Sequence, residues 1–433
     1  MIKFLEKQIN DFKKRGIIGL IHKIKILIQL ILNVFLSLPF FILAIPFVFL
    51  LRIAEPFILI RIGRLISSRI GHFAGNTELY LCEKDNKINT PNRKHIDLFY
   101  YAYYPICNKY LAKKIAKLLV IYPKIIMEPI LILNKLIPGW KKFEICQNTQ
   151  HDRDVHNLLD KSNLHFYFTY EEKVKGNEKI EKIGIPLESK IVCLFVRDNA
   201  YLLQKLGRGY DYHNYRDCNI QNYLKAADEL TKLGYYVVRM GAVVKEKLNT
   251  NNPMIIDYAS SGRRSDFLDI YLAYKCEFVI TSSSGWDSVP SHLFRKPILY
   301  TNVVPIGLLL TFSSKFMLTT RKYFDTNNNI NLKFSDIYSK GYAFYTKNEE
   351  YLNSNLKLIE NSQDEICDAV LEMTQFVSNK LRLTDYDLKL QKSFWNSFPV
   401  KAKDTYYKGN LLHGEIKAIM SPSFLRNNNS LIN

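Results

Sequence analysis

The sequence has no pair of cysteines at the spacing of a disulfide framework or a zinc site. Its seven cysteines are scattered along 433 residues, and no Cys-x-x-Cys pair occurs among them. An odd number of scattered cysteines is typical of free thiols in a reducing compartment. This distribution argues against a small secreted domain held together by disulfides.

The common motifs for nucleotides and metal ions are also missing. There is no Walker-type loop and no Gly-x-Gly-x-x-Gly, which argues against a P-loop ATPase or a dinucleotide enzyme. We assign no Asp-x-Asp pair to Mn²⁺, because the polar loop at Tyr215-Arg216-Asp217 supplies a single carboxylate. The sequence therefore predicts neither a bound metal ion nor a cofactor.

The charge is strongly one-sided. The chain has 60 Lys and Arg against 41 Asp and Glu, a formal net charge of +19. Such an excess indicates an anionic partner. The basic residues form no long block and no zinc-finger spacing is present, so lipid and phosphorylated ligands are favoured and nucleic acid is not expected.

One long apolar run stands near the N-terminus. No charged residue occurs from Ile26 to Leu51, and as a straight helix this run would measure about 39 Å, more than the roughly 30 Å of a hydrocarbon core. It lies too far from the start for a signal peptide. We therefore predict that residues 1–52 form a basic amphipathic helix followed by a membrane anchor.

Two topologies of this anchor remain open. Lysines precede the run, arginines follow it, and the cysteines favour the cytosol, so the positive-inside rule places both flanks there. Pro39 and Pro46 would let the segment dip into the membrane and return, because proline breaks or kinks a helix. The run is also long enough for a plain span. The expected location is the cytoplasmic membrane, with the catalytic domains facing the cytosol.

The second half of the chain alternates short apolar strands with helices. Strands are predicted at 190–197, 235–241, 254–259, 277–281 and 297–302, and helices at 219–233, 265–273 and 286–294. This alternation is typical of a parallel, doubly wound sheet. Earlier, strands are expected at 57–62 and 78–82. We expect two such domains, at 53–185 and 186–380, and a tail at 381–433 that packs back on the N-terminal domain.

Ligands of such sheets bind where the strands end. Arginines, hydroxyls and a serine-rich turn occur at these ends, and arginine contacts phosphate in a planar, bidentate way while a helix N-terminus offers free N–H groups. Arg197 could instead pair with a carboxylate, and Arg263 and Arg264 could be a solvated pair. The predicted donor-binding residues are Arg197, Asp198, His213, Arg216, Arg239, Gly241, Arg263, Asp266, Asp269, Ser282, Ser283, Ser284 and Gly285.

Three blocks of the chain resemble a family of bacterial glycosyltransferases, from about residue 56 onward. The blocks are IRIGRLISSRIGHFAGNTELYL, FVRDNAYL with YHNYRDCNIQNYLKAADELTKLGYYVVRMG, and SGRRSDFLDIYLAYKCEFVITSSSGWDSVPSHLFRKPILYTNVVP. More distantly, the second half is similar to the nucleotide-sugar domain of fucosyltransferase-like GT-B enzymes. The resemblance implies two Rossmann-like domains with the reaction between them, an acceptor-side domain at 53–185 and a nucleotide-sugar-binding domain at 186–380.

The resemblance also implies residue roles. In the fucosyltransferase-like enzymes a strand-end arginine contacts the donor diphosphate, and Arg197 matches it. Asp198 stands where a second arginine is often found, which leaves the donor open. A glycine-rich loop after the first strand faces phosphate and acceptor, and residues 68–73 match it, with Arg69 and Gly71 as loop residues and His72 as the candidate general base.

Together these features predict a membrane-associated, metal-independent glycosyltransferase. It would move a hexosyl or fucosyl group from a nucleotide-diphosphate sugar to a cell-surface glycan or lipid-linked acceptor. Two alternatives stay open. One is a membrane-anchored scaffold that keeps the fold without catalysis, and the other is a transferase for another phosphorylated donor.

Overall fold

The computed structural model describes residues 24, 37–145, 153–206, 211–399 and 412–432. The chain forms two compact units that interleave in sequence. The first comprises Met1–Leu65, Pro91–Ala102 and Leu119–Cys146, and the second comprises Ile66–Thr90, Tyr103–Leu118 and Gln147–Asn433. The units therefore do not divide at one boundary near residue 185. The amphipathic helix predicted before the apolar run lies outside the described residues.

The first unit contains a parallel sheet of four strands in the order β3-β2-β1-β4. The long strands are β1 (Leu59–Leu65) and β2 (His95–Tyr101), and the edges are the short β3 (Val120–Ile121) and β4 (Glu144–Ile145). Its core also includes helix α4 (Lys124–Asn134), which supplies buried apolar side chains. β1 is the strand that the sequence predicts at 57–62, shifted by two or three residues.

The apolar run forms a helix from Ser37 to Ala54 in this unit. Ala44, Val48 and Leu51 pack into the core of the unit, beside residues of β1 and α4. The helix continues without interruption through Pro46. The re-entrant interpretation requires a turn at a proline of this run, and the chain makes no turn at Pro46.

The second unit is built on a seven-stranded sheet in the order β14-β10-β9-β8-β5-β6-β7. All neighbouring strands in it are parallel. From β5 the chain winds one way through β6 to β7 and the other way through β8, β9 and β10, so the sheet is doubly wound. The strands are β5 (Lys190–Phe195), β6 (Tyr235–Arg239), β7 (Ile255–Ile256), β8 (Phe278–Thr281), β9 (Ile298–Val303), β10 (Phe316–Thr320) and β14 (Ile419–Met420).

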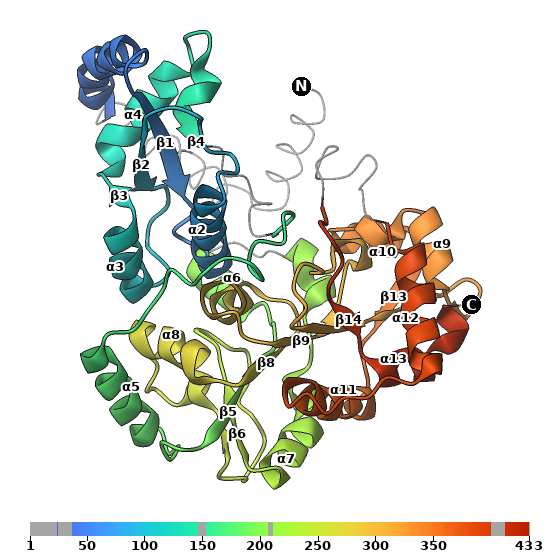
Figure 1. Cartoon of the computed structure of the whole chain (residues 1–433). Coiled ribbons are helices and arrows are strands. Elements are labelled where there is room, and N and C mark those ends of the chain that lie inside the picture. The colour runs from blue at the N-terminus through green and yellow to red at the C-terminus, as the bar shows by residue number, and fades with distance from the viewer. Residues whose placement is uncertain (1–23, 25–36, 146–152, 207–210, 400–411, 433) are drawn as a thin grey trace. The chain divides into compact units, whose positions relative to one another are not determined.

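Helices cover both faces of this sheet (Figure 1). Val192 and Leu194 of β5 face a core that contains α7 (Leu224–Lys232) and α11 (Gln363–Val377). Cys193 lies between them in sequence, points to the other face and contacts the carbonyl of Leu272 in α8 (Asp266–Lys275). Burial on both faces explains why the strands are continuous apolar runs, as the sequence predicts. The α/β class with parallel sheets is confirmed.

Further helices of the second unit come from the part of the chain that precedes β5. They are α2 (Ile70–Asp85), α3 (Lys109–Leu118) and α5 (Tyr170–Lys182). The strand predicted at 78–82 is wrong, because these residues lie inside α2. They are apolar or buried on all sides, so the helical period that would have revealed α2 is absent from the sequence.

The C-terminal part completes the second unit. A small antiparallel sheet of β12 (Ile330–Asn331), β11 (Lys322–Asp325) and β13 (Leu356–Ile359) follows β10. The tail supplies β14 at the edge of the large sheet, and its residue Leu412 also accepts a hydrogen bond from Arg153. The remaining helices are α6 (Ala200–Leu206), α9 (Phe334–Ser339), α10 (Asn348–Asn353), α12 (Asp385–Ser397) and α13 (Pro422–Asn427).

Candidate functional site

A pocket of about 730 Å³ opens at the carboxyl ends of the central strands of the large sheet. Its walls include the residues after β5, β6, β8 and β9, and all lining residues belong to the second unit. β5 and β8 are neighbours in the sheet, and the winding reverses between them. Loops diverge at such a reversal and leave a crevice, which is where ligands of doubly wound sheets bind.

Arg197 follows β5 and is almost fully buried, with 7% of its surface exposed. Its backbone N–H donates to Ser282 Oγ at 2.8 Å, and its Nη1 donates to the carbonyl of His213 at 3.0 Å. The nearest carboxylate, Asp217, lies 3.8 Å away. Burial and the neighbouring Arg216 lower the pKa of Arg197 to about 10. Arg197 is therefore cationic at neutral pH, and no carboxylate of the described residues lies within hydrogen-bonding distance of its guanidinium.

Arg216 reaches the same wall from a 3₁₀ helix at Asp211–Arg216. It donates to the carbonyl of Ser283, while its buried Nε has no hydrogen-bond partner among the described residues. His213 lies in the same short helix, and burial together with Arg216, Arg197 and Arg69 lowers its pKa to about 4. The imidazole is thus neutral at pH 7, in a pocket with a strongly positive potential.

The turn Ser282–Gly285 brings a second helix close to this wall. Ser283 has a left-handed backbone, with φ of 61°, and Gly285 touches the first turn of α2. A Cβ on Gly71 would lie 2.8 Å from the Gly285 carbonyl oxygen and 2.9 Å from its Cα. Both neighbours are backbone atoms, so only glycine permits this approach.

The N-terminus of α2 therefore faces the pocket. Arg69, Gly71 and His72 all line it. Arg69 is the N-cap residue and makes no side-chain cap, and the first turn contains no acidic residue. The predicted loop at 68–73 is in fact mostly the start of a helix, whose positive dipole end favours an anion.

The carboxylates that line the pocket are already bonded. Asp198 accepts the backbone N–H groups of Ala200 and Lys245, both at 2.9 Å. Asp269 accepts from Arg264 at 2.5 Å and from Tyr258 at 3.0 Å, and burial raises its pKa to about 6. These acids fix loops and one arginine, and neither is recorded as an ion pair with Arg197 or Arg216.

Four predicted donor-binding residues lie outside the lining of the pocket. Arg239 is buried against the carbonyl of Glu246 and the carboxylate of Asp257. Ser282 is turned inward to the N–H of Arg197. The other two serve local contacts: exposed Arg263 donates to the Lys182 carbonyl and Asp266 accepts from the Lys109 N–H.

The other predicted residues do line the pocket. Those from the donor set are Arg197, Asp198, His213, Arg216, Gly241, Asp269, Ser283, Ser284 and Gly285. The prediction did not include several lining residues that lie far apart in sequence, among them Arg153, Tyr212, Trp286, His292 and Lys347. Arg264 lines the pocket and Arg263 does not, and adjacent arginines in a sequence do not indicate which of the two turns inward.

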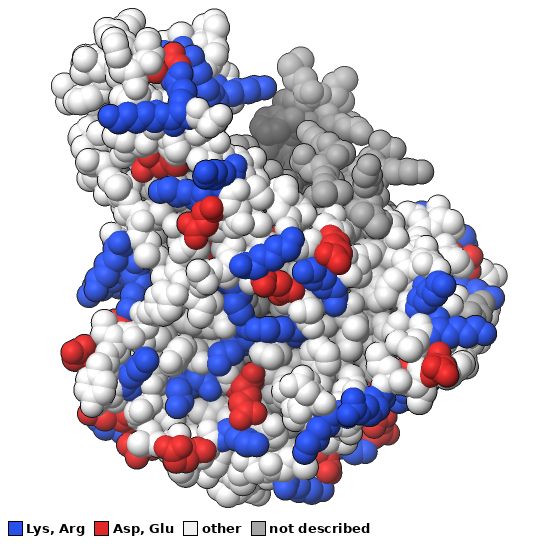
Figure 2. Space-filling model, in the orientation of Figure 1, with Lys and Arg blue, Asp and Glu red and all other residues white. Residues whose placement is uncertain are grey.

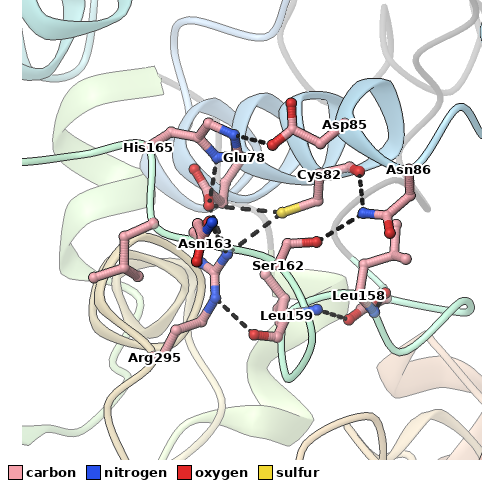
Figure 3. Close-up of polar contacts among 12 residues, drawn as sticks. Glu78, Cys82, Asp85, Asn86, Leu158, Leu159, Ser162, Asn163, His165 and Arg295 are labelled. Carbon is pink, nitrogen blue, oxygen red and sulfur yellow. Dashed lines mark hydrogen bonds and ion pairs between the residues drawn. The ribbon is translucent and has the colours of Figure 1, made fainter.

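A buried ionic cluster holds α2 in place (Figure 3). Glu78, in the middle of α2, is fully buried and pairs with Arg295 at 2.7 Å and with His165 at 3.1 Å. His165 also contacts Asp85 at 2.9 Å, and its contacts with Cys82 and Glu78 raise its pKa to about 10. Two cations thus balance two carboxylates, and the pairing fixes the position of α2 along its axis.

Glu78, Cys82 and His165 are also close enough to share a cation, since their ligand atoms lie within 4.8 Å of one another. Arg295 already supplies the positive charge there, contacting Glu78 and Cys82. None of these residues lines the pocket. Two Asp-x-Asp sequences occur elsewhere. Their described residues include Asp154, which accepts the N–H groups of Leu158 and Leu159 in a turn, and Asp387, which accepts the N–H of Thr384 at the N-cap of α12.

Comparison with solved structures finds sugar-modifying enzymes. The structure is similar to ADP-heptose LPS heptosyltransferase II of E. coli (13% identity, 60% of this chain and 90% of that chain, TM-score 0.37). It is also similar to a family 9 glycosyltransferase from Veillonella parvula DSM 2008 (14%, 73% and 96%, 0.39). A third similar structure, from Listeria monocytogenes, is described as a UDP-N-acetylglucosamine 2-epimerase (8%, 78% and 97%, 0.29).

Glycosyltransferases are thus among the solved structures to which this chain is similar, as the sequence resemblance led us to expect. Identities of 8–14% and TM-scores below 0.4 assign no donor, acceptor or reaction to this chain. A scan against protein-family models and a search of curated proteins give no match. The specific resemblance to fucosyltransferase-like enzymes stays a prediction.

The contact between Gly71 and Gly285 leads to the first prediction. Gly71→Ala forces two backbone segments apart and should cost about 1–3 kcal/mol of unfolding free energy, and it should weaken anion binding in the pocket. Thermal unfolding and pyrophosphate titration measure the two effects. Lys84→Ala, at an exposed position of the same helix, should change neither. Wild-type behaviour of Gly71→Ala would mean that the helix and the turn are not held together as described.

Proposed function

We propose that this protein is a glycosyltransferase whose pocket binds a nucleotide-diphosphate sugar. The observation that carries the proposal is geometric: the buried Arg197 and the neighbouring Arg216 line the pocket together with the first turn of α2. Two adjacent arginines beside a helix N-terminus are suited to a ligand with two negative charges. A diphosphate esterified at both ends carries that charge.

Two parts of the pocket would bind the diphosphate from different sides. Arg197 and Arg216 would contact the diphosphate from the β5 side, and the N–H groups at the start of α2 would contact it from the other. The pocket volume of about 730 Å³ lies in the range of ligand sites that enclose a molecule of nucleotide-sugar size. Lining aromatic side chains such as Tyr212 and Trp286 offer flat surfaces for a base or a sugar.

The proposed reaction follows from these positions. An acceptor hydroxyl attacks the anomeric carbon, the new carbon–oxygen bond forms, and the bond from that carbon to the diphosphate breaks. The electron pair leaves on the diphosphate, where arginines and N–H groups stabilise it in place of a metal. His72, in the first turn of α2, would take the proton of the acceptor hydroxyl. Nothing in this scheme fixes an inverting or a retaining outcome.

Membrane association completes the proposal. The Ser37–Ala54 helix has a mean hydropathy of 2.2 and is long enough to span a membrane. We propose that it holds the enzyme on the cytoplasmic membrane, with the catalytic part in the cytosol, where nucleotide sugars are made. The acceptor would then be a lipid-linked or cell-surface glycan precursor. A different phosphorylated donor or a non-catalytic scaffold are the alternatives that the experiments below separate.

The central test is donor binding by an arginine variant. Calorimetry with a panel of nucleotide sugars should find one that binds the wild type, and Arg216→Ala should weaken it about 10- to 100-fold, the effect of a lost bond to a charged group. Arg216→Lys should recover part of the loss. Arg263→Ala, outside the pocket, should bind as the wild type does.

Product analysis completes this test. Mass spectrometry of the bound donor after incubation should show sugar transfer to an acceptor or slow hydrolysis. Epimerised donor, or release of a phosphorylated group other than a sugar, would replace the proposed reaction. Binding without turnover would favour a non-catalytic scaffold. If no nucleotide sugar binds, the pocket is not a nucleotide-sugar site.

The role of His72 is tested by kinetics. His72→Ala should lower kcat about 10²- to 10⁴-fold, the usual contribution of a general base, and leave the donor Kd unchanged. Exposed His156 provides the control, and His156→Ala should retain full kcat. If His72→Ala weakens donor binding and spares kcat, the imidazole contacts the donor and another group takes the proton.

His213 should couple donor binding to proton uptake. Its pKa is about 4 in the free protein, and a bound diphosphate would raise it, so the donor complex binds more protons and affinity rises as the pH falls from 7 toward 5. Calorimetry at pH 5.5 in two buffers with different protonation enthalpies measures the uptake. His213→Gln should abolish most of it. Unchanged uptake in this variant would assign the proton to Asp269, whose pKa is about 6.

A further inference from the structure

The first unit carries an unusually apolar surface. On the Ser37–Ala54 helix, large side chains such as Ile42, Phe49 and Ile53 are 58–68% exposed, and only 17% of this stretch is buried. Phe57, just beyond the helix, is 82% exposed, and Leu136, just beyond α4, is 77% exposed. Soluble monomers rarely leave such a continuous apolar area in water. The described part of the chain leaves this surface uncovered, which suits an apolar partner.

The helix is nevertheless part of a folded core. Ala44, Val48 and Leu51 recur at helical spacing on one face and pack against the β1–α4 core. At 100° per residue, Ile42, Phe49 and Ile53 fall on the opposite face. The helix therefore has one side for the protein and one side for its partner.

Arg52 fastens the end of this helix to the end of α4. Its Nε donates to Asn134 Oδ1 at 2.8 Å, and its Nη1 donates to the Pro138 carbonyl at 2.8 Å. Its Nη2 donates to the carbonyls of Asn134 and Ile137. These carbonyls lie at and beyond the C-terminus of α4, where a cation is favoured. The helix cannot leave the unit without exposing them.

This attachment disfavours a helix that crosses the bilayer. A crossing would draw the attached sheet toward the hydrocarbon, although β1 and β2 carry the buried ion pair of Arg61 and Asp97, at 2.6 Å. Within the described residues, the edge strands β3 and β4 also have no neighbouring strand on one side, and backbone groups left open in this way cannot be satisfied in lipid. A helix lying flat avoids both penalties, because only its outer face enters the membrane.

The charges around the apolar surface indicate the kind of membrane. Arg93 and Lys142 both contact Glu55, the acidic residue that follows the helix, at 2.5 and 2.9 Å. Two cations around one carboxylate leave a positive balance at the edge of the apolar face, where Lys141 is also exposed. Basic side chains beside an apolar face are typical of binding to anionic phospholipid.

We infer that the first unit binds the surface of an anionic bilayer through the outer face of the Ser37–Ala54 helix, which lies in the membrane plane. This inference rests on the membrane association proposed above and is independent of sugar transfer. A second copy of the chain would cover the same apolar face but would meet its basic edge with an identical basic edge. Charge complementarity therefore favours lipid over a dimer.

Vesicle binding of the full chain tests the face. Sedimentation with vesicles containing phosphatidylglycerol should capture the wild type, and the triple variant I42E/F49E/I53E should partition about 100-fold less, given the cost of acids in an apolar layer. L352E, an exposed apolar position of the second unit, serves as the control. Nucleotide-sugar binding should be equal in all three, so a failed donor assay leaves this test intact. Equal vesicle binding by the triple variant, or a lipid-independent dimer that it abolishes, would overturn the inference.

Depth measurement separates a flat helix from a spanning one. Spin labels are placed singly at residues 38, 42, 45, 49 and 53 after Cys107 and Cys146 have been replaced by Ser, and power saturation gives the depth of each. A flat helix should hold positions 38 and 53 as deep as position 45. Shallow ends with a deep centre would show a spanning helix and contradict the inference.

Discussion

The reversal of winding between β5 and β8 is the constraint on which the rest of the second unit depends. Because these two strands are neighbours in the sheet, the loops that follow them begin side by side. The N–H of Arg197 therefore donates to Ser282 Oγ at 2.8 Å. That bond ties the arginine-bearing loop to the serine turn. The serine turn also contacts α2, because Gly285 packs against Gly71 in the first turn of that helix. Loops from β5, β8 and α2 are thereby gathered around one cavity.

Holding α2 there requires a long-range anchor, because it is separated by about 200 residues of sequence from the turn that it touches. Glu78 provides it by pairing with Arg295, which follows the turn and its helix in the chain. A buried carboxylate is tolerated only when it is paired. Sliding α2 along its axis would separate Glu78 from Arg295, so the pairing favours one placement of the helix over shifted ones. The N-terminus of α2, two turns earlier, is placed with the same precision.

The sequence allowed the strands and one part of the site to be predicted, for a clear reason. Strands buried on both faces are continuous apolar runs, and their carboxyl ends point to one edge, so Arg197, Ser283 and Gly285 could be expected together. The orientation of a side chain at that edge could not. Arg239 ends its strand in the same way as Arg197, yet it turns inward to the Glu246 carbonyl. Similarly, α2 shows no helical period because it is buried on every side.

The acids of the pocket explain why its positive charge persists. Three aspartates line the pocket against five arginines. Of these acids, Asp198 is already bonded to the N–H groups of Ala200 and Lys245, and Asp269 to Arg264 and Tyr258. Asp217 Oδ1 lies 3.8 Å from Arg197 Nη1, beyond hydrogen-bonding distance, and burial raises the pKa of this carboxyl group. The carboxylates therefore hold loops in place, while burial together with Arg216, Arg197 and Arg69 lowers the pKa of His213. An anion that enters this pocket meets polar groups whose positions are already fixed by the fold, which reduces the cost of ordering them on binding.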